Sequence, residues 1–156
     1  MTVTIAAETP LQDDVRMMVA DLNATMIPLT PREFQFQLTV ERMADPALTT
    51  FVARDETGRH VGMASLKDHG GGVGEVKRMF TLPEVRGQRV GSLLLQRIEQ
   101  LAREKGISRL VLETGEAPGF EAAYRVYERG GFTVCGAVLD YPDSGFSRFY
   151  EKKISS

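Results

Sequence analysis

The segment LPEVRGQRVGSLLLQRIEQLAREKG, residues 82–106, joins a cationic, glycine-containing turn directly to a helical pattern. Apolar residues recur at positions 90, 93, 94, 98 and 101, which predicts one amphipathic helix that ends at Gly106. The first turn of a helix carries backbone N–H groups without intrahelical partners, and the helix dipole adds partial positive charge there. An anion such as a phosphate is therefore favoured at the start of this helix.

The residues of the turn suit a phosphate or a pyrophosphate. Gly87 and Gly91 allow close approach to the backbone, and Arg86 and Arg89 supply positive charge. On this chemistry alone, an ordinary surface turn before a helix explains the residues equally well. Two other phosphate loops are disfavoured, because the dinucleotide fingerprint needs three glycines directly after a strand and the nucleoside triphosphate loop needs Gly-Lys-Ser/Thr.

Composition sets broad limits on the class of protein. The chain has 156 residues, a net charge of -2 and 42% apolar residues, which is typical of a single domain, residues 1–156. Basic residues cluster only locally, around 77–89, which favours a small anionic ligand and predicts no nucleic-acid partner. The lone Cys135 and the lack of metal-ligand spacing predict neither a disulfide nor a metal site. Without a signal-peptide pattern or a membrane-spanning run, we expect a cytoplasmic protein with no membrane association.

Helical and strand patterns alternate along the chain. The early part combines a first strand, a capped helix and a second helix start at Thr30–Glu33, and a hairpin and a third strand follow. A strand–helix–strand–helix–strand order then completes a mixed α/β (α+β) sandwich, with a mostly antiparallel twisted sheet flanked by about four helices. The expected strands cover residues 3–7, 49–54, 60–67, 73–82, 108–114, 132–139 and 147–154, and the expected helices begin near residues 9, 30, 90 and 120.

Two motifs in this order resemble a known family. VKRMFTLPEVRGQRVGSLLL, residues 76–95, resembles the acetyl-CoA-binding motif of the GNAT superfamily of N-acyltransferases. Arg86 and Gly91 match the ends of its Arg/Gln-x-x-Gly-x-Gly/Ala pattern, and Arg89 stands where the middle glycine is usual. AAYRVYERGGF, residues 122–132, resembles the family's A-x-x-x-Y-E-x-x-G-F junction between a helix and a strand. The resemblance runs from about residue 50 to residue 154 and implies the acyl-CoA N-acyltransferase fold.

The resemblance also implies a reaction and a set of binding residues. An acetyl group would move from acetyl-CoA to an amine within a ternary complex, without a metal. The strand before the turn would bind the pantetheine arm through its main chain, and the turn and helix start would bind the pyrophosphate. The implied cofactor-binding residues are Met79, Phe80, Thr81, Arg86, Gly87, Gln88, Arg89, Val90, Gly91 and Ser92.

Tyr127 and Glu75 are the implied catalytic residues. Tyr127 matches the family tyrosine that often protonates the departing thiolate, and Tyr124 is its substitute. A core aromatic is the alternative for Tyr127, but burial and proton donation are compatible and the motif match favours the catalytic role. Glu75 is a candidate general base, with water and backbone carbonyls as the alternative. Glu75 could instead pair with a neighbouring basic residue on an exposed face. Strand alternation places Glu75 on one face with residues 77, 79 and 81, and a β-bulge common in the family would shift that order.

The acceptor is predicted only as an amine of a small molecule or a peptide. Asp140 and Asp143 are weak hints of a cationic acceptor and could equally be ordinary loop acids. His69 is expected to face solvent, and Cys135 is expected to be a buried thiol without a catalytic part. Two rivals remain: a CoA-binding sensor without catalysis, and a nucleotide-using enzyme that shares only the phosphate site. Homodimers are common in the family, but the sequence locates no interface.

Overall fold

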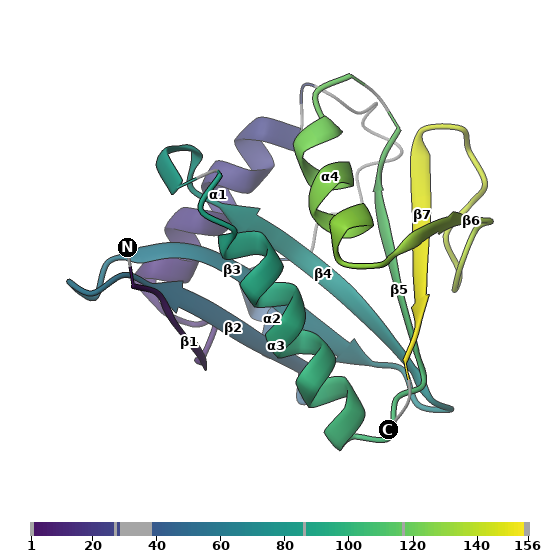
Figure 1. The fold of residues 1–156 in the computed structure, drawn as a ribbon, viewed down its shortest axis with the longest axis horizontal. Coiled ribbons are helices and arrows are strands. Elements are labelled where there is room, and N and C mark those ends of the chain that lie inside the picture. Colours follow the sequence, from purple (N-terminus) through teal and green to yellow (C-terminus); the bar gives the residue numbers. More distant parts are fainter. Residues whose placement is uncertain (1, 27, 29–38, 86, 117, 155–156) are drawn as a thin grey trace.

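A computed structural model describes residues 2–26, 28, 39–85, 87–116 and 118–154 as seven strands and four α-helices (Figure 1). The strands form one sheet in the order β1-β2-β3-β4-β5-β7-β6, and among the neighbouring pairs only β4 and β5 run parallel. This arrangement confirms the predicted mostly antiparallel sandwich. The elements are β1 Thr4–Ala7, α1 Asp13–Met26, α2 Val40–Met43, β2 Leu48–Arg54, β3 His60–Asp68, β4 Val73–Thr81, α3 Val90–Glu104, β5 Arg109–Gly115, α4 Glu121–Arg129, β6 Thr133–Cys135 and β7 Ser147–Lys153.

The helices cover both faces of the sheet. In Figure 1, α3 crosses the near face of β2 and β3, while α1 and α2 lie behind the sheet. The sequence explains the position of α3, because its apolar stripe is buried, including Leu94, Ile98 and Ala102. A Cβ added to Gly62 of β3 would lie 3.2 Å from Leu94 Cδ1, so this glycine lets α3 pack closely on the sheet.

A bulge interrupts β4 at Arg78. Met63 of β3 pairs with Phe80 and Ser65 pairs with Lys77, so two β4 residues oppose the single residue between Met63 and Ser65. Arg78 adopts the left-handed conformation, with φ 55°. Because of the extra residue, Phe80 lies on the same face as Lys77, and the simple alternation expected along the strand is wrong beyond the bulge. The bulge implied by the family resemblance is confirmed.

Strands β4 and β5 separate soon after they pair. Their parallel ladder joins Val73–Glu75 to Arg109–Val111, although both strands continue well beyond this ladder. The edge of β4 that faces β5 is therefore free of strand pairing from residue 76 onward. This separation opens the middle of the sheet between α1 on one face and α3 with α4 on the other.

Three parts of the expected fold differ from the structure or lie outside it. Helix α1 begins at Asp13 rather than near residue 9, although Thr9 Oγ1 accepts from the Leu11 N–H as an N-cap would; the Arg16 N–H donates to the Gln12 carbonyl over 3.0 Å at the start of the helix. Strand β6 ends at Cys135, and Leu139 has φ 53°, which no strand accommodates. The helix start expected at residues 30–33 lies outside the described residues.

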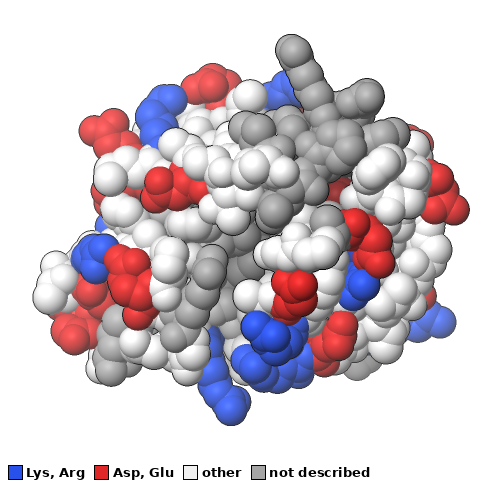
Figure 2. Space-filling view, turned by 90° about the horizontal axis from the view of Figure 1, so that it is seen from above, with Lys and Arg blue, Asp and Glu red and all other residues white. Residues whose placement is uncertain are grey.

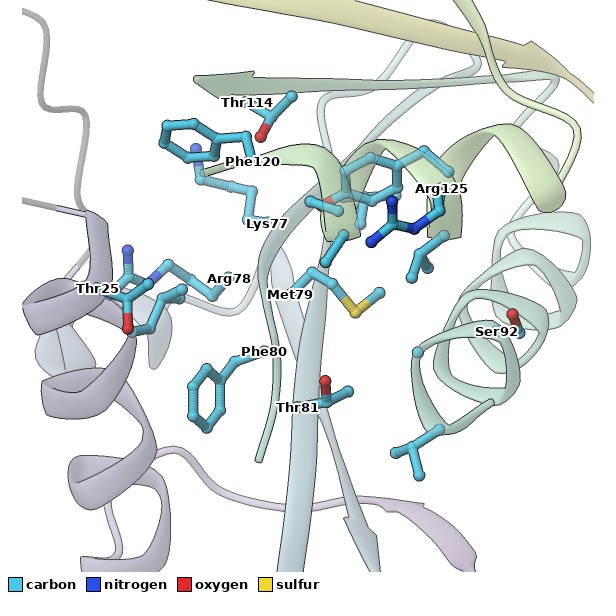
Figure 3. A pocket seen from close by; sticks show the side chains of 18 of the residues that line it. Thr25, Lys77, Arg78, Met79, Phe80, Thr81, Ser92, Thr114, Phe120 and Arg125 are labelled. Atoms are coloured by element: carbon cyan, nitrogen blue, oxygen red, sulfur yellow. The ribbon is translucent and has the colours of Figure 1, made fainter. Parts of the chain in front are cut away.

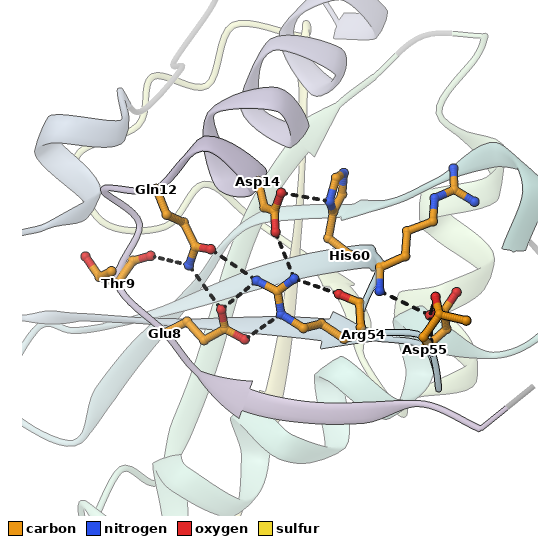
Figure 4. A network of polar contacts seen from close by, with 10 residues as sticks. Glu8, Thr9, Gln12, Asp14, Arg54, Asp55 and His60 are labelled. Carbon is orange, nitrogen blue, oxygen red and sulfur yellow. Dashed lines mark hydrogen bonds and ion pairs between the residues drawn. The ribbon is translucent and has the colours of Figure 1, made fainter.

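Arg54 ties β1 and α1 to the central hairpin (Figure 4). On β2, its Nε and Nη2 donate to the two carboxylate oxygens of Glu8 over 3.0 and 2.8 Å. Its Nη1 donates to Asp14 Oδ2 in the first turn of α1 over 2.8 Å. These hydrogen bonds from Arg54 lower the pKa of both Glu8 and Asp14. The network therefore sets the position of α1, which forms one wall of the opening in the sheet.

We predict that Arg54→Met lowers the free energy of unfolding, and by more at pH 7 than at pH 3. A carboxylate whose pKa is lowered by folding stabilises the folded state above its unfolded pKa, and this contribution disappears as the pH falls. Glu8 and Asp14 are partly exposed, so screening limits the expected loss at pH 7 to about 1–2 kcal/mol. Urea unfolding at both pH values measures it.

Arg16→Met is the matched control, because Arg16 pairs with Glu41 over 3.0 Å on an open surface. We expect a much smaller loss for this variant. An equal loss for Arg54→Met at pH 3 and pH 7 would assign the effect to packing of the arginine stem and contradict the charge argument.

Candidate active site

A cleft of about 450 Å³ occupies the opening between β4 and β5. Figure 3 shows successive β4 residues, from Lys77 to Thr81, along its wall, with α1, α3 and α4 around them. One predicted residue, Gln88, is exposed and does not border the cleft. The prediction for Arg86 lies outside the described residues. The predicted residues that line it are Glu75, Met79, Phe80, Thr81, Gly87, Arg89, Val90, Gly91, Ser92 and Tyr127.

The start of α3 offers unpaired donors to the cleft. Arg89, with φ 63°, precedes the helix without a side-chain capping bond, and the Leu93 N–H donates to its carbonyl over 3.0 Å. The N–H groups of residues 90–92 precede that first bond and have no intrahelical acceptor. Ser92 Oγ is buried and has no hydrogen-bond partner. A bound oxyanion would satisfy these groups, so the residues present fit a phosphate.

Gly91 brings α3 close to α4. A Cβ at this position would lie 3.2 and 3.4 Å from the two methyl carbons of Val126 and 3.9 Å from Thr81 Cγ2. The first two distances are shorter than ordinary van der Waals contact. The missing side chain of Gly91 therefore serves the packing of the two helices beside the cleft, in addition to any contact with a ligand.

Tyr127 lies buried between the sheet and α4. Its ring packs against the rings of Tyr150 and Phe132, with centroids 5.7 and 6.2 Å away. Burial raises its pKa, and the nearby Glu113 and Tyr150 add to this effect. Tyr127 therefore keeps its proton and is available as a hydrogen-bond donor. The hydroxyl of Tyr124, the substitute candidate, already donates to the Gly115 carbonyl, which makes it a weaker candidate for that task.

Glu75 is held by three side chains at the point where β4 and β5 separate. Its Oε2 accepts from Tyr141 Oη over 2.6 Å and from Lys77 Nζ over 3.1 Å. Its Oε1 lies 2.9 Å from His69 Nε2. The carboxylate is only 3% exposed. Both oxygens are thus engaged, and the cluster fixes the side of the cleft that faces α1.

Glu113 on β5 is a second carboxylate in the cleft, and the sequence analysis missed it. Within the described part of the chain, its carboxylate accepts a single, long side-chain hydrogen bond, from Ser147 Oγ over 3.4 Å. Burial raises the pKa of Glu113 to about 7. The hydrogen bond from Ser147 and the charge of Lys77 act to lower this pKa, and the charge of Glu75 acts to raise it. The available signal was an acidic residue directly after the buried run Leu110–Leu112, which is an unusual place for a solvated charge.

The loops contribute to the cleft differently from what the sequence suggested. His69 is exposed, as expected, but its Nε2 also reaches Glu75 Oε1, which the sequence did not indicate. Tyr141 also lines the cleft, whereas its neighbours Asp140 and Asp143 are exposed and do not. Cys135 lies on β6 outside the lining, and burial raises the pKa of its thiol.

The described residues show neither a metal cluster nor a membrane-spanning helix. Within residues 2–154, less the masked positions, no group of His, Cys, Asp or Glu side chains is placed to hold a metal ion. No α-helix of that same portion is long and apolar enough to cross a bilayer. On the face in Figure 2, acidic and basic side chains are interspersed, in keeping with a net charge of -2.

Comparison with known proteins identifies the family. Residues 16–132 match the acetyltransferase (GNAT) family. The chain belongs to the GNAT family. It is 40% identical over 153 residues to an IAA acetyltransferase of Azospirillum brasilense, covering 97% of this chain and 98% of that protein. The GNAT resemblance of the two sequence motifs is thereby confirmed.

Solved structures agree with this assignment. A Klebsiella pneumoniae protein assigned to the acyl-CoA N-acyltransferases is 29% identical, with a TM-score of 0.82 and 97% of each chain covered. PaiA N-acetyltransferase of Thermoplasma acidophilum, solved in complex with coenzyme A, shares the fold, with a TM-score of 0.75, 18% identity and coverage of 99% and 100%. This GNAT protein is therefore an acetyl-CoA-dependent N-acetyltransferase that acts on an amine acceptor.

We predict that Gly91→Val lowers both stability and acetyl-CoA affinity. The new methyl groups would press on Val126 and move α4 away from α3, at a cost of about 1–3 kcal/mol. Thermal unfolding and calorimetric titration with acetyl-CoA measure the two effects.

The double variant Gly91→Val/Val126→Ala tests the cause. Removing the two methyl carbons should recover part of both losses, which is a non-additive result expected of residues in contact. Simple addition of the two single effects would contradict the packing role of Gly91.

Proposed function

We propose that this chain transfers the acetyl group of acetyl-CoA directly to a primary amine, with both substrates bound in the cleft between β4 and β5. The observation that carries the proposal is the composition of that one cleft. It joins the unpaired start of α3, the buried hydroxyl of Tyr127 and two carboxylates. Phosphate binding, leaving-group protonation and proton removal from the amine then have separate groups in a continuous space.

The cofactor would lie along β4 with its diphosphate at α3. The free edge of β4 beyond Glu75 offers main-chain groups to the amides of the pantetheine arm, at Met79, Phe80 and Thr81. The diphosphate would accept from the first N–H groups of α3 and from Ser92 Oγ. Gly87, Arg89, Val90 and Gly91 would border it, whereas for Arg86 and Gln88 only the family resemblance supports a contact.

Tyr127 would donate its hydroxyl proton to the sulfur as CoA leaves. Its raised pKa keeps the hydroxyl protonated at neutral pH, and it has no hydrogen bond to another described side chain that would compete. Its position on α4 faces the cleft between the start of α3 and Glu113. A donor at this place stabilises the negative charge that develops on sulfur.

The acceptor arrives as an ammonium and must lose a proton before it attacks the thioester carbonyl. We propose that Glu113 takes this proton, directly or through water, because its pKa of about 7 matches the task and its oxygens are nearly free. Glu75, the candidate base in the sequence analysis, would then hold Lys77 and Tyr141 in place. With both of its oxygens engaged, it is the second candidate for the base.

Direct transfer agrees with the position of the only thiol. A two-step route would need a nucleophile in the cleft to carry the acetyl group. Cys135 is outside the lining, and burial raises its pKa, so it is a poor nucleophile. The acetyl carbon would therefore bond to the amine nitrogen as the carbon–sulfur bond breaks, with one proton passing to Glu113 and one to the sulfur.

We further propose that residues 1–156 act as one N-acetyltransferase domain in the cytoplasm. The single sheet that includes β1 and β7 supports the first part. An unpaired cysteine and the use of acetyl-CoA fit the reducing interior of a cell. Small-molecule and peptide amines both remain open as acceptors in this scheme, and a homodimer is compatible with it.

Tyr127→Phe should reduce kcat about 10- to 100-fold and leave the Kd for acetyl-CoA nearly unchanged, because only the hydroxyl is lost from a packed ring. Release of CoA thiol with an acceptor measures the first quantity, and calorimetry measures the second. Tyr124→Phe is the matched control on the same helix and should keep most of the activity. If tight acetyl-CoA binding comes without turnover on any amine, the chain is a sensor and the enzymatic proposal fails.

The identity of the base can be read from a pH profile. In the wild type, kcat/KM should rise as the pH passes through about 7, since Glu113 must be ionised to accept a proton. Glu113→Gln should remove this rise and lower kcat/KM above pH 7 by about 100-fold. Glu75→Gln should keep the rise at a reduced rate, and the reverse pattern for the two variants would make Glu75 the base.

A further inference from the structure

Arg78 is a buried cation that the proposed transfer does not use. It stands at the bulge of β4, in the left-handed conformation, and is only 8% exposed. Figure 3 shows its side chain extending from β4 toward α1, on the side where Thr25 lies. Both Arg78 and Thr25 line the cleft. A bulge of this kind redirects a side chain, and a strained backbone is often found where a side chain serves a ligand.

The guanidinium has few partners in the described part of the chain. One nitrogen, Nη2, donates to Asn23 Oδ1 of α1, and Nε is buried without any partner. No described carboxylate pairs with it, and burial alone lowers its pKa to about 10. Arg78 therefore remains charged at pH 7, with its charge withdrawn from water and not offset by any described carboxylate.

Neighbouring charges do not compensate Arg78. Lys77 and Glu75 neutralise each other over 3.1 Å. Burial disfavours the ionised form of Glu113, so its carboxyl group is partly protonated near neutral pH. Among the described residues, the α1 side of the cleft thus holds one cation in excess, and an unpaired buried charge costs folding free energy. A ligand that supplies a negative group there would offset this cost.

We propose that the acceptor is a primary amine that also carries a carboxylate or another oxyanion, and that Arg78 binds this anionic group. The inference rests on the proposed acetyl transfer and specifies its acceptor. The planar guanidinium can bind a carboxylate or phosphonate through two parallel hydrogen bonds, of which the buried Nε supplies one. The amine of the same molecule would then lie toward Glu113 and Glu75. An amino acid or an aminophosphonate has both groups.

This assignment replaces the cationic acceptor suggested by the acidic loop. Asp140 and Asp143 are exposed and do not border the cleft, so they do not select its ligand. A structural role is the competing explanation, in which Arg78 only fastens α1 through Asn23. The two explanations differ in whether the charge preference for acceptors depends on Arg78.

The experiment uses sets of acceptors that share an amine and differ in one neighbouring group. One set is phenylalanine, phenylalaninamide and phenethylamine, and a second is β-alanine, β-alaninamide and 2-aminoethylphosphonate, with further amino acids and their amides added. Each compound is assayed for acetyl transfer and, by calorimetry, for binding to the CoA-saturated protein. The variants are Arg78→Met, Arg78→Lys and Asn23→Ala, and the last keeps the cation while removing its bond to α1.

We expect the wild type to favour the anionic member over the amide in at least one set by about 10- to 100-fold in kcat/KM, or in affinity if no transfer occurs. Arg78→Met should abolish this preference. Arg78→Lys should retain part of it, because charge remains and the paired geometry is lost. Asn23→Ala should retain it fully. The phosphonate and carboxylate members show which oxyanion is bound better.

Equal use of amide and acid in every set, or a preference that survives Arg78→Met, overturns the inference. The inference is also overturned if each of the two single variants, Asn23→Ala and Arg78→Met, loses the preference for the acid. That result would assign a structural role to the pair of residues. Titration of each protein with acetyl-CoA separates this failure from that of the proposed function. If acetyl-CoA does not bind the wild type, the transferase proposal falls, whereas normal binding without an acid preference refutes only the role of Arg78.

Discussion

The early separation of β4 from β5 is the constraint on which the rest of the site depends. A parallel pair that remained together to its end would fill the space where the cleft lies. Here the ladder stops at Glu75 and Val111, and the bulge at Arg78 follows within three residues. The sheet gives up hydrogen bonds at this place, and unpaired backbone becomes available to a ligand. Helices packed on the two faces then close the opening into a binding site.

Electrostatics divides this opening into two regions. At the α3 side, the first turn of the helix and Ser92 favour an anion without a large net charge of the protein. At the α1 side, side chains of both signs lie close together, and burial is the main cause of the raised pKa of Glu113, with a smaller contribution from Glu75. A cofactor with phosphates and a substrate with an ionisable amine can thus be held by opposite regions of the same cleft.

Sequence reasoning captured what depends on local pattern. The start of α3 and the hairpin follow from spacing and turn chemistry, and the structure agrees with both. The choice of Tyr127 on α4 came from the family resemblance. It failed where distant segments meet. His69, Tyr141 and Glu113 come from three separate parts of the chain, and only the register of the sheet brings them to the cleft. The bulge at Arg78 also escaped the residue pattern, because an arginine carries no local signal for a left-handed backbone.

The hydrogen-bond network of Arg54 connects the amino-terminal residues to the acceptor side of the cleft. Glu8 lies close to the amino terminus, and through Arg54 it is connected to the first turn of α1, whose later turns carry Leu22 and Asn23. Affinity tags or deletions that disturb the first eight residues would therefore shift the wall that faces the acceptor, while the coenzyme end stays intact. Preparations of the protein that differ only in an added or deleted N-terminal segment would then differ in acceptor preference while they bind the coenzyme equally well.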